Sequence, residues 1–255
     1  MDNQFILSPY YIDKPAEHLK RFAKAGWQIN EVDLPDTTNP QDKASAVHKG
    51  IADKVEAALK EGKRPISVAG DCCSTIPVYA GLQRAGLEPS FLWLDSHGDF
   101  NTWETTPSGF LGGMPLAMMA GLGEQRMPDA VGLKTIPVEK IILADGRDLD
   151  PGEQKLVESA KIKHIKSFEE LKTYLFNGPV YLHFDVDVLH LDDLPAVNYP
   201  AKGGPHASEV AEVFRVLKDR LELVALSCTI GVWNTRHNDL ETGEAKAWSL
   251  FELLF

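Results

Sequence analysis

The sequence predicts an α/β fold in which a mainly parallel sheet is covered by helices on both faces. Short apolar, β-branched segments alternate with segments of helical periodicity, and this order is typical of right-handed βαβ crossovers. The strand segments are almost continuously apolar, as expected for parallel strands that are buried on both sides. No repeat or low-complexity linker interrupts the chain, so we expect a single domain over residues 1–255.

Five segments are predicted to be strands and six to be helices. The predicted strands are residues 65–69, 91–94, 140–144, 180–184 and 223–226. The predicted helices are residues 42–61, 75–85, 152–160, 168–176, 207–220 and 243–254.

Composition excludes several classes of partner. The chain has 26 Lys and Arg against 37 Asp and Glu, a net charge of −11, which argues against a nucleic-acid partner. No apolar segment approaches the roughly 20 residues that cross a bilayer, and we expect neither a membrane span nor a signal peptide. Three cysteines are too few for a disulfide framework, so we expect a reducing, cytoplasmic setting.

Polar clusters follow three of the predicted strands. In open parallel sheets ligands bind outside the carboxyl ends of the strands, so we expect the clusters to converge on one site. The clusters are Gly70-Asp71-Cys72, Asp95-Ser96-His97-Gly98-Asp99 and Asp185-Val186-Asp187.

These clusters are predicted to bind metal. On an extended backbone side chains alternate with a period of two, so Asp95, His97 and Asp99 should share one side, as should Asp185 and Asp187. Burying several carboxylates together is costly unless cations neutralise them. One or two divalent ions would do so, and oxygen with imidazole suits Mn²⁺, or also Zn²⁺ or Fe²⁺. The alternative is a loop whose aspartates only cap turns.

The order and spacing of these clusters resemble the motifs of the arginase–agmatinase ureohydrolases. Residues 93–102 resemble their Asp-x-His-x-Asp motif, and the match continues to Gly113-Met114-Pro115. Residues 146–153 resemble a segment typical of arginases proper. The resemblance spans roughly residues 65–250 and implies a three-layer αβα arginase-type fold with a mainly parallel eight-stranded sheet.

The resemblance also implies roles for individual residues. Asp95 and Asp185 would bridge two Mn²⁺ ions, with His97 and Asp187 completing one metal and Asp99 serving the other. The metals would activate a water that attacks a guanidinium carbon. The amino-acid end of a small-molecule substrate would be held by Asn101, Ser108, Asp150 and Glu153. Homo-oligomers, trimers or hexamers, are expected on the same basis.

Six positions depart from the family pattern, among them Cys73 in place of a serine and His190 in place of an aspartate. Cys72 stands where the family has a histidine ligand; its thiolate would favour Zn²⁺, or it is a buried small hydrophobe beside a weak or empty metal position. Gly112 stands where a histidine shuttles protons, and Ser227 where a carboxylate grips the guanidinium. His183 replaces the serine that begins the third motif.

His183 could compensate for part of this loss. It precedes Asp185 by two residues, so strand alternation aims both side chains at the same side. We therefore hypothesise that His183 is a metal ligand or a proton carrier, against the alternative of a hydrogen-bonded structural histidine. Asp99 and His183 are the candidate catalytic residues.

Two functions remain open from the sequence. One is a metal-dependent hydrolase of a linear C–N bond in a guanidino, amidino or amide small molecule. The other is a non-catalytic, arginase-like binding or regulatory protein, because fold alone does not fix function.

Overall fold

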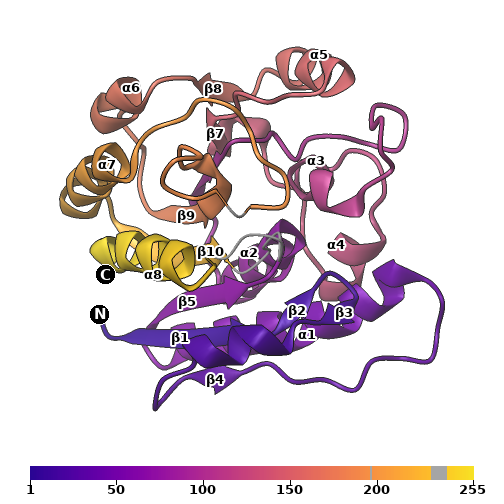
Figure 1. Cartoon of the computed structure of the whole chain (residues 1–255). Coiled ribbons are helices and arrows are strands. Elements are labelled where there is room, and N and C mark those ends of the chain that lie inside the picture. The colour runs from indigo at the N-terminus through magenta and orange to yellow at the C-terminus, as the bar shows by residue number, and fades with distance from the viewer. Residues whose placement is uncertain (196, 231–239) are drawn as a thin grey trace.

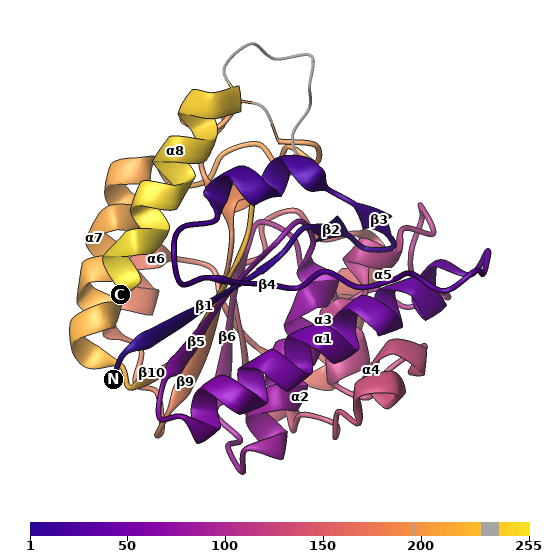
Figure 2. The same cartoon turned by 90° about the horizontal axis from the view of Figure 1, so that it is seen from below.

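A computed structural model of the chain describes residues 1–195, 197–230 and 240–255 and shows three layers (Figures 1 and 2). The middle layer is an eight-stranded sheet with the order β4-β1-β5-β10-β9-β6-β7-β8, and every neighbouring pair is parallel. Its strands are β1 (Asn3–Ser8), β4 (Gln28–Ile29), β5 (Arg64–Ala69), β6 (Ser90–Asp95), β7 (Ile141–Asp145), β8 (Lys163–Ile165), β9 (Val180–Asp185) and β10 (Leu223–Thr229). The predicted α/β fold with an eight-stranded parallel sheet is confirmed.

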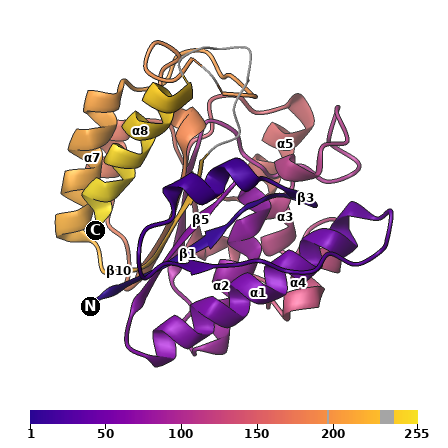
Figure 3. The ribbon, with the colours of Figure 1, turned by 60° about the horizontal axis from the view of Figure 1, so that its bottom comes forward.

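Helices cover both faces of this sheet (Figures 2 and 3). One face carries α1 (Pro40–Lys60), α2 (Thr75–Arg84), α3 (Pro115–Met119), α4 (Arg126–Val131) and α5 (Pro151–Ala160). The other carries α6 (Phe168–Thr173), α7 (Ala207–Arg220) and α8 (Leu240–Phe251). A short antiparallel pair, β2 (Tyr10–Tyr11) and β3 (Lys14–Pro15), follows β1.

Two hydrophobic cores explain why the strands are apolar throughout. In β6, Phe91 and Trp93 belong to the core under α1 and α2, while Leu92 and Leu94 belong to the core under α7 and α8. All four side chains are fully buried. The period of two therefore distributes one apolar segment between two cores.

All the predicted strands and helices are present, but several elements were missed. The strands β1, β4 and β8 were not predicted, nor were the short helices α3 and α4. β4 has two residues and β8 has three, so neither shows a pattern without the neighbouring strand. The predicted helix 168–176 ends at Thr173, because Tyr174 is extended.

No helix within the described residues is both long and apolar enough to span a bilayer.

Candidate metal centre

The candidate site lies where four neighbouring strands end. β5, β10, β9 and β6 are adjacent in the sheet, and all are parallel, so their carboxyl ends meet at one edge. The first three contribute Cys72, Thr229 and Asp185 at or just after their ends, and β6 contributes Asp95. The predicted convergence of the polar clusters is thus present in the structure.

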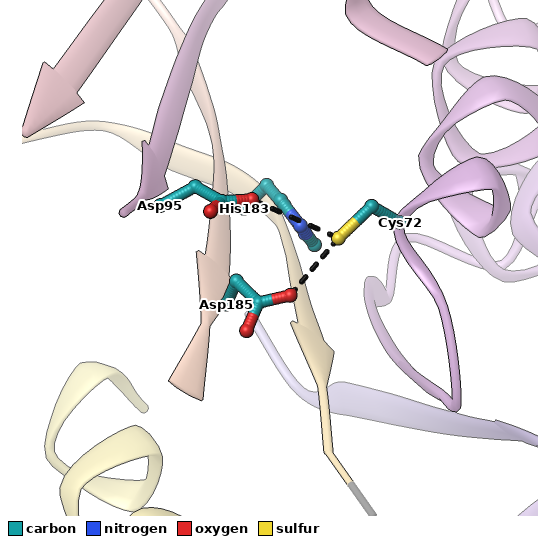
Figure 4. Close-up of side chains that lie close together, drawn as sticks. All are labelled: Cys72, Asp95, His183 and Asp185. Atoms are coloured by element: carbon teal, nitrogen blue, oxygen red, sulfur yellow. Dashed lines mark hydrogen bonds between the residues drawn. The ribbon is translucent and has the colours of Figure 1, made fainter. Parts of the chain in front are cut away.

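The first cluster of possible metal ligands, which we call the Cys72 group, consists of Cys72, Asp95, His183 and Asp185 (Figure 4). One ligand atom from each residue lies within 4.8 Å of the others. The thiol of Cys72 donates to Oδ2 of Asp185 at 3.0 Å and lies 3.8 Å from Oδ2 of Asp95. A thiol, an imidazole and two carboxylates are donors that a divalent transition metal accepts.

A second cluster, the His97 group, shares Asp95 and adds His97 and Asp187. Nδ1 of His97 lies 2.9 Å from Oδ2 of Asp187 and 3.5 Å from Oδ1 of Asp95. The Ser96 hydroxyl donates to Oδ1 of Asp187 at 2.8 Å and so fixes that carboxylate. The two groups place possible ligands on both sides of Asp95.

Hydrogen bonds orient His183 within the Cys72 group. Nδ1 of His183 lies 2.8 Å from the Ser227 hydroxyl, which lies 2.7 Å from the Tyr181 hydroxyl. On its other side, Nε2 lies 3.5 Å from Oγ1 of Thr229, which lies 3.4 Å from Sγ of Cys72. Ser227 thus holds the Nδ1 side of the His183 ring. Thr229 lines the pocket, whereas Ser227 does not.

The charges of the two groups are balanced differently. Burial, together with Asp187, raises the pKa of Asp95 to about 7, and burial with Asp187 and Asp95 raises the pKa of Asp185. Burial opposes protonation of His97, but the carboxylates of Asp187 and Asp95 outweigh it and raise the pKa of its imidazole. Burial outweighs the opposing effect of the Asp187 carboxylate and lowers the pKa of His183 to about 3, which leaves a neutral ring. Among the residues that the structure describes, the Cys72 group therefore has no compensating cation of its own.

The period-two argument is wrong for the ends of both motifs. Strand β6 stops at Asp95, and Asp99 lies in a turn with a left-handed φ of 45°. Strand β9 stops at Asp185, and a 3-10 turn over Val186–Val188 carries Asp187. Because strand alternation does not extend beyond the strand, Asp99 lines the pocket but belongs to neither ligand group.

The residues predicted to hold the substrate gather on one side of the pocket. Nδ2 of Asn101 donates to Oδ2 of Asp150 at 3.0 Å, and Ser108 is an exposed lining residue. Glu153 is buried, and its carboxylate accepts the backbone N–H groups of Phe100 and Asp150. Glu153 therefore holds the turn that carries Asp99, while Asn101, Ser108 and Asp150 face the pocket.

One pocket of about 420 Å³, within the range of small-molecule sites, is lined by Cys72, Asp95, Asp185, His97, Asp187, Asp99 and the four predicted substrate residues. The buried His183 and Ser227 are not among its lining residues. Within the described residues no Lys or Arg lines it, whereas eight acidic residues do. These are Asp71, Asp95, Asp99, Asp148, Asp150, Glu153, Asp185 and Asp187.

Three aromatic residues in the pocket were missed by sequence reasoning. They are Tyr11, Phe110 and Tyr199, and they come from segments far apart in the chain. Of the three, only Phe110 lies near a position that the sequence had singled out, because it precedes Gly112 by two residues. A Cβ at Gly112 would lie 2.5 Å from Cζ of Phe110, so the Phe110 ring occupies the space that a side chain at 112 needs.

Comparison with known proteins connects this site to others. The family model described as the arginase family matches residues 9–229. Arginase of Bacillus subtilis is 33% identical over 172 residues, covering 62% of this chain and 58% of that protein. N(omega)-hydroxy-L-arginine amidinohydrolase of Streptomyces lavendulae is 27% identical over 221 residues, covering 85% and 74%. The crystal structure of Bacillus subtilis arginase matches with a TM-score of 0.80 at 26% identity, covering 100% of this chain and 98% of that one.

Proposed function

The chain belongs to the arginase family, and we propose that it is a metal-dependent hydrolase of a linear C–N bond in a guanidino, amidino or amide small molecule. The aligned part spans just over half the length of the first arginases that it matches, 58% and 51%. The proposal therefore depends on the site of this chain and not on the names of its relatives.

One observation supports the proposal most. Two groups of possible metal ligands share Asp95 at the bottom of a pocket of small-molecule size. Carboxylates buried together without Lys or Arg among the described lining residues need an external cation. A divalent metal fits this requirement, and the donor atoms suit it.

The donor sets favour different metals. Each group has one imidazole, but only the Cys72 group has a sulfur ligand. A thiolate with imidazole suits Zn²⁺ or Fe²⁺, whereas the two carboxylates and imidazole of the His97 group suit Mn²⁺. Asp95, which belongs to both groups, and Asp185, which belongs to the Cys72 group, would hold the metal, and Asp99 would contribute from the turn that follows β6. Bound there, a divalent metal would lower the pKa of a water and polarise the substrate.

The remaining residues would position His183, transfer protons and bind the substrate. Ser227 holds Nδ1 of His183, which leaves Nε2 directed towards Cys72 and Asp185. Gly112 offers no group to protonate a leaving amine, so Asp99 is the proposed proton carrier, and His183 would take this role only if its Nε2 does not bind the metal. Asn101, Ser108 and Asp150 would bind the polar end of the substrate, with Glu153 supporting them. The Streptomyces relative, named for an N-hydroxylated arginine, makes substituted guanidines sensible test substrates.

Metal content and turnover test this function together. We expect elemental analysis to find one or two divalent ions per chain, and hydrolysis of at least one compound in a panel of guanidines, amidines and amides. Chelation should abolish turnover, and Mn²⁺ or Zn²⁺ should restore it. A protein that folds without metal and hydrolyses nothing in the panel would instead be a non-catalytic binding protein. Gel filtration would test the proposed homo-oligomer.

A cobalt-loaded protein tests the thiolate directly. Co²⁺ bound to sulfur gives a charge-transfer absorption that oxygen and nitrogen ligands do not give. We expect this band in the wild type and its loss in Cys72→Ser. Cys73→Ser is the matched control, because the buried Cys73 thiol points to the carbonyl of Leu111 and does not line the pocket. An unchanged band in Cys72→Ser would exclude Cys72 as a ligand.

A further inference from the structure

The pocket has an aromatic wall made of Tyr11, Phe110 and Tyr199. The Phe110 ring lies 6.3 Å from Tyr11 and 5.1 Å from Tyr199, centroid to centroid, and is near-parallel to both. The hydroxyls of the two tyrosines lie 3.4 Å apart. The three side chains therefore form one continuous apolar surface along the pocket.

The aromatic wall stands on the Cys72 side of the pocket. The backbone N–H of Ile12, next to Tyr11, donates to Oδ2 of Asp71, the residue before Cys72. The thiol of Cys73 lies 3.7 Å from the carbonyl of Leu111, next to Phe110. Asn101 and Asp150 pair with each other on the side of His97 and Asp99. The aromatic wall thus lies next to the Cys72 segment and apart from the Asn101–Asp150 pair.

The wall also lies where the family pattern would place a polar side chain, at Gly112. The Phe110 ring fills the space beside Gly112, so no side chain can reach the pocket from there. A hydrocarbon surface contributes binding by burying a ligand's apolar surface and offers no hydrogen bond. Asp71, Asp148 and Asp150 line the same pocket but belong to neither ligand group, so they can attract positive charge in the metal-loaded protein.

We propose that the pocket binds an organic cation of the guanidinium or amidinium type whose substituent is apolar and packs against the aromatic wall. The proposal deepens the proposed function, since it takes the pocket as the substrate site. It does not depend on turnover. Carboxylates select the charge, and the wall selects the substituent, as in pockets where a few polar groups orient a largely apolar ligand.

Calorimetric titration of the metal-loaded protein with three probes tests the proposal. Guanidine supplies the charge alone, benzylguanidine adds the apolar group, and benzylurea keeps the shape without the charge. We expect benzylguanidine to bind at least about ten-fold more tightly than guanidine, because burying part of a phenyl ring is worth that much. Benzylurea should bind at least about ten-fold more weakly than benzylguanidine, since it leaves the carboxylates without a cation.

Variants of the wall locate the effect. Tyr199→Ala and Phe110→Ala should each reduce the preference for benzylguanidine over guanidine towards one. Tyr199 is about half exposed, so its removal should not disturb folding. Trp103→Ala is the control, because Trp103 is a similarly exposed aromatic residue that does not line the pocket.

The outcomes separate this inference from the proposed function. Equal binding of guanidine and benzylguanidine, binding of neither, or a preference that survives both wall variants would overturn the aromatic subsite, even if the protein hydrolyses a guanidine. Tight binding of benzylguanidine that needs the wall would support the subsite, even if nothing in the panel is hydrolysed.

Discussion

The two ligand groups share Asp95 but are built differently. In the His97 group, the imidazole forms ion pairs with Asp187 and Asp95, and its side chain is 25% exposed. In the Cys72 group, His183 is completely buried and bonded to a serine. The first group is thus partly neutralised by its own imidazolium, whereas the second contains no cation among its own residues.

The departures from the family pattern concentrate on one of these two sides. Cys72, His183 and Ser227 belong to one hydrogen-bonded chain through Thr229, and Gly112 lies against Phe110 next to the Cys73 contact. On the other side, His97 and Asp187 keep the expected pattern. Cys72, His183 and Ser227 therefore contact one another, directly or through Thr229, so a change at one of them affects the packing of the others.

Removing Asp95 should break both groups and have the largest effect. Asp95→Ala is expected to weaken the binding of every metal by more than about 100-fold, because loss of even a supporting residue costs 10- to 100-fold. Equilibrium dialysis with Mn²⁺ and Zn²⁺ measures the affinities, and the exposed Asp219→Ala is the control. Retention of one tightly bound ion would show that the groups do not share this ligand.

The difference in charge balance should appear as a pH dependence of the metal-free protein. The pKa of Asp95 is raised to about 7 in the folded state from 3.8, so its protonated form is favoured by folding. The contribution of Asp95 to the free energy of unfolding should then be highest below about pH 4. It should fall by up to about 1.4 kcal/mol for each pH unit between about pH 4 and pH 7, and it should be lost above pH 7.

Two variants test whether this fall in the free energy of unfolding comes from Asp95 or from Asp187 of the His97 group. Asp95→Asn should remove much of it, as chemical denaturation at several pH values would show. The pKa of Asp187 is lowered in spite of burial, mainly by His97, so its contribution is present above its unfolded pKa and is lost as the pH falls. Asp187→Asn should therefore reduce the loss at rising pH only in part, because Asp187 contributes to the raised pKa of Asp95 but burial is the larger cause. Saturating Mn²⁺ should flatten the profile, and an unchanged fall in Asp95→Asn would contradict the interpretation.

Removing the support of His183 should affect only the Cys72 group. Ser227→Ala is expected to weaken metal binding there by about 10- to 100-fold, since Nδ1 of His183 loses its partner. Ser67→Ala is the matched control: Ser67 is Ser227's registered neighbour on β5, equally buried, and its hydroxyl has no partner among the described residues. Cobalt absorption can follow this position through the thiolate, and an effect of equal size in both variants would exclude the supporting role.

The smallest effect concerns stability at the aromatic side. Gly112→Ala is expected to destabilise the protein by about 1–3 kcal/mol, because the new methyl group would collide with Phe110. Gly113→Ala should cost less, since nothing lies within 4 Å of a Cβ there. Thermal unfolding measures both, and Phe110→Ala combined with Gly112→Ala should recover part of the loss.

Much of the site was predictable because it follows strand ends. Asp95 and Asp185 close buried apolar strands, so their meeting at one edge needed only the parallel sheet. Asp99 and Asp187 were harder, because turns after the strands decide their directions. Their motif was recognisable, but the period of two was not valid beyond the last residue of each strand.

The sequence alone determined the kind of fold and the kinds of donor, since apolar strands, helical periodicity and polar strand ends are local patterns. Only the tertiary structure decided which donors meet. The register of β9 and β10 sets Ser227 beside His183 and so makes that histidine part of the Cys72 group. The aromatic wall unites residues 11, 110 and 199, and no local pattern encodes such a surface because packing between distant segments creates it.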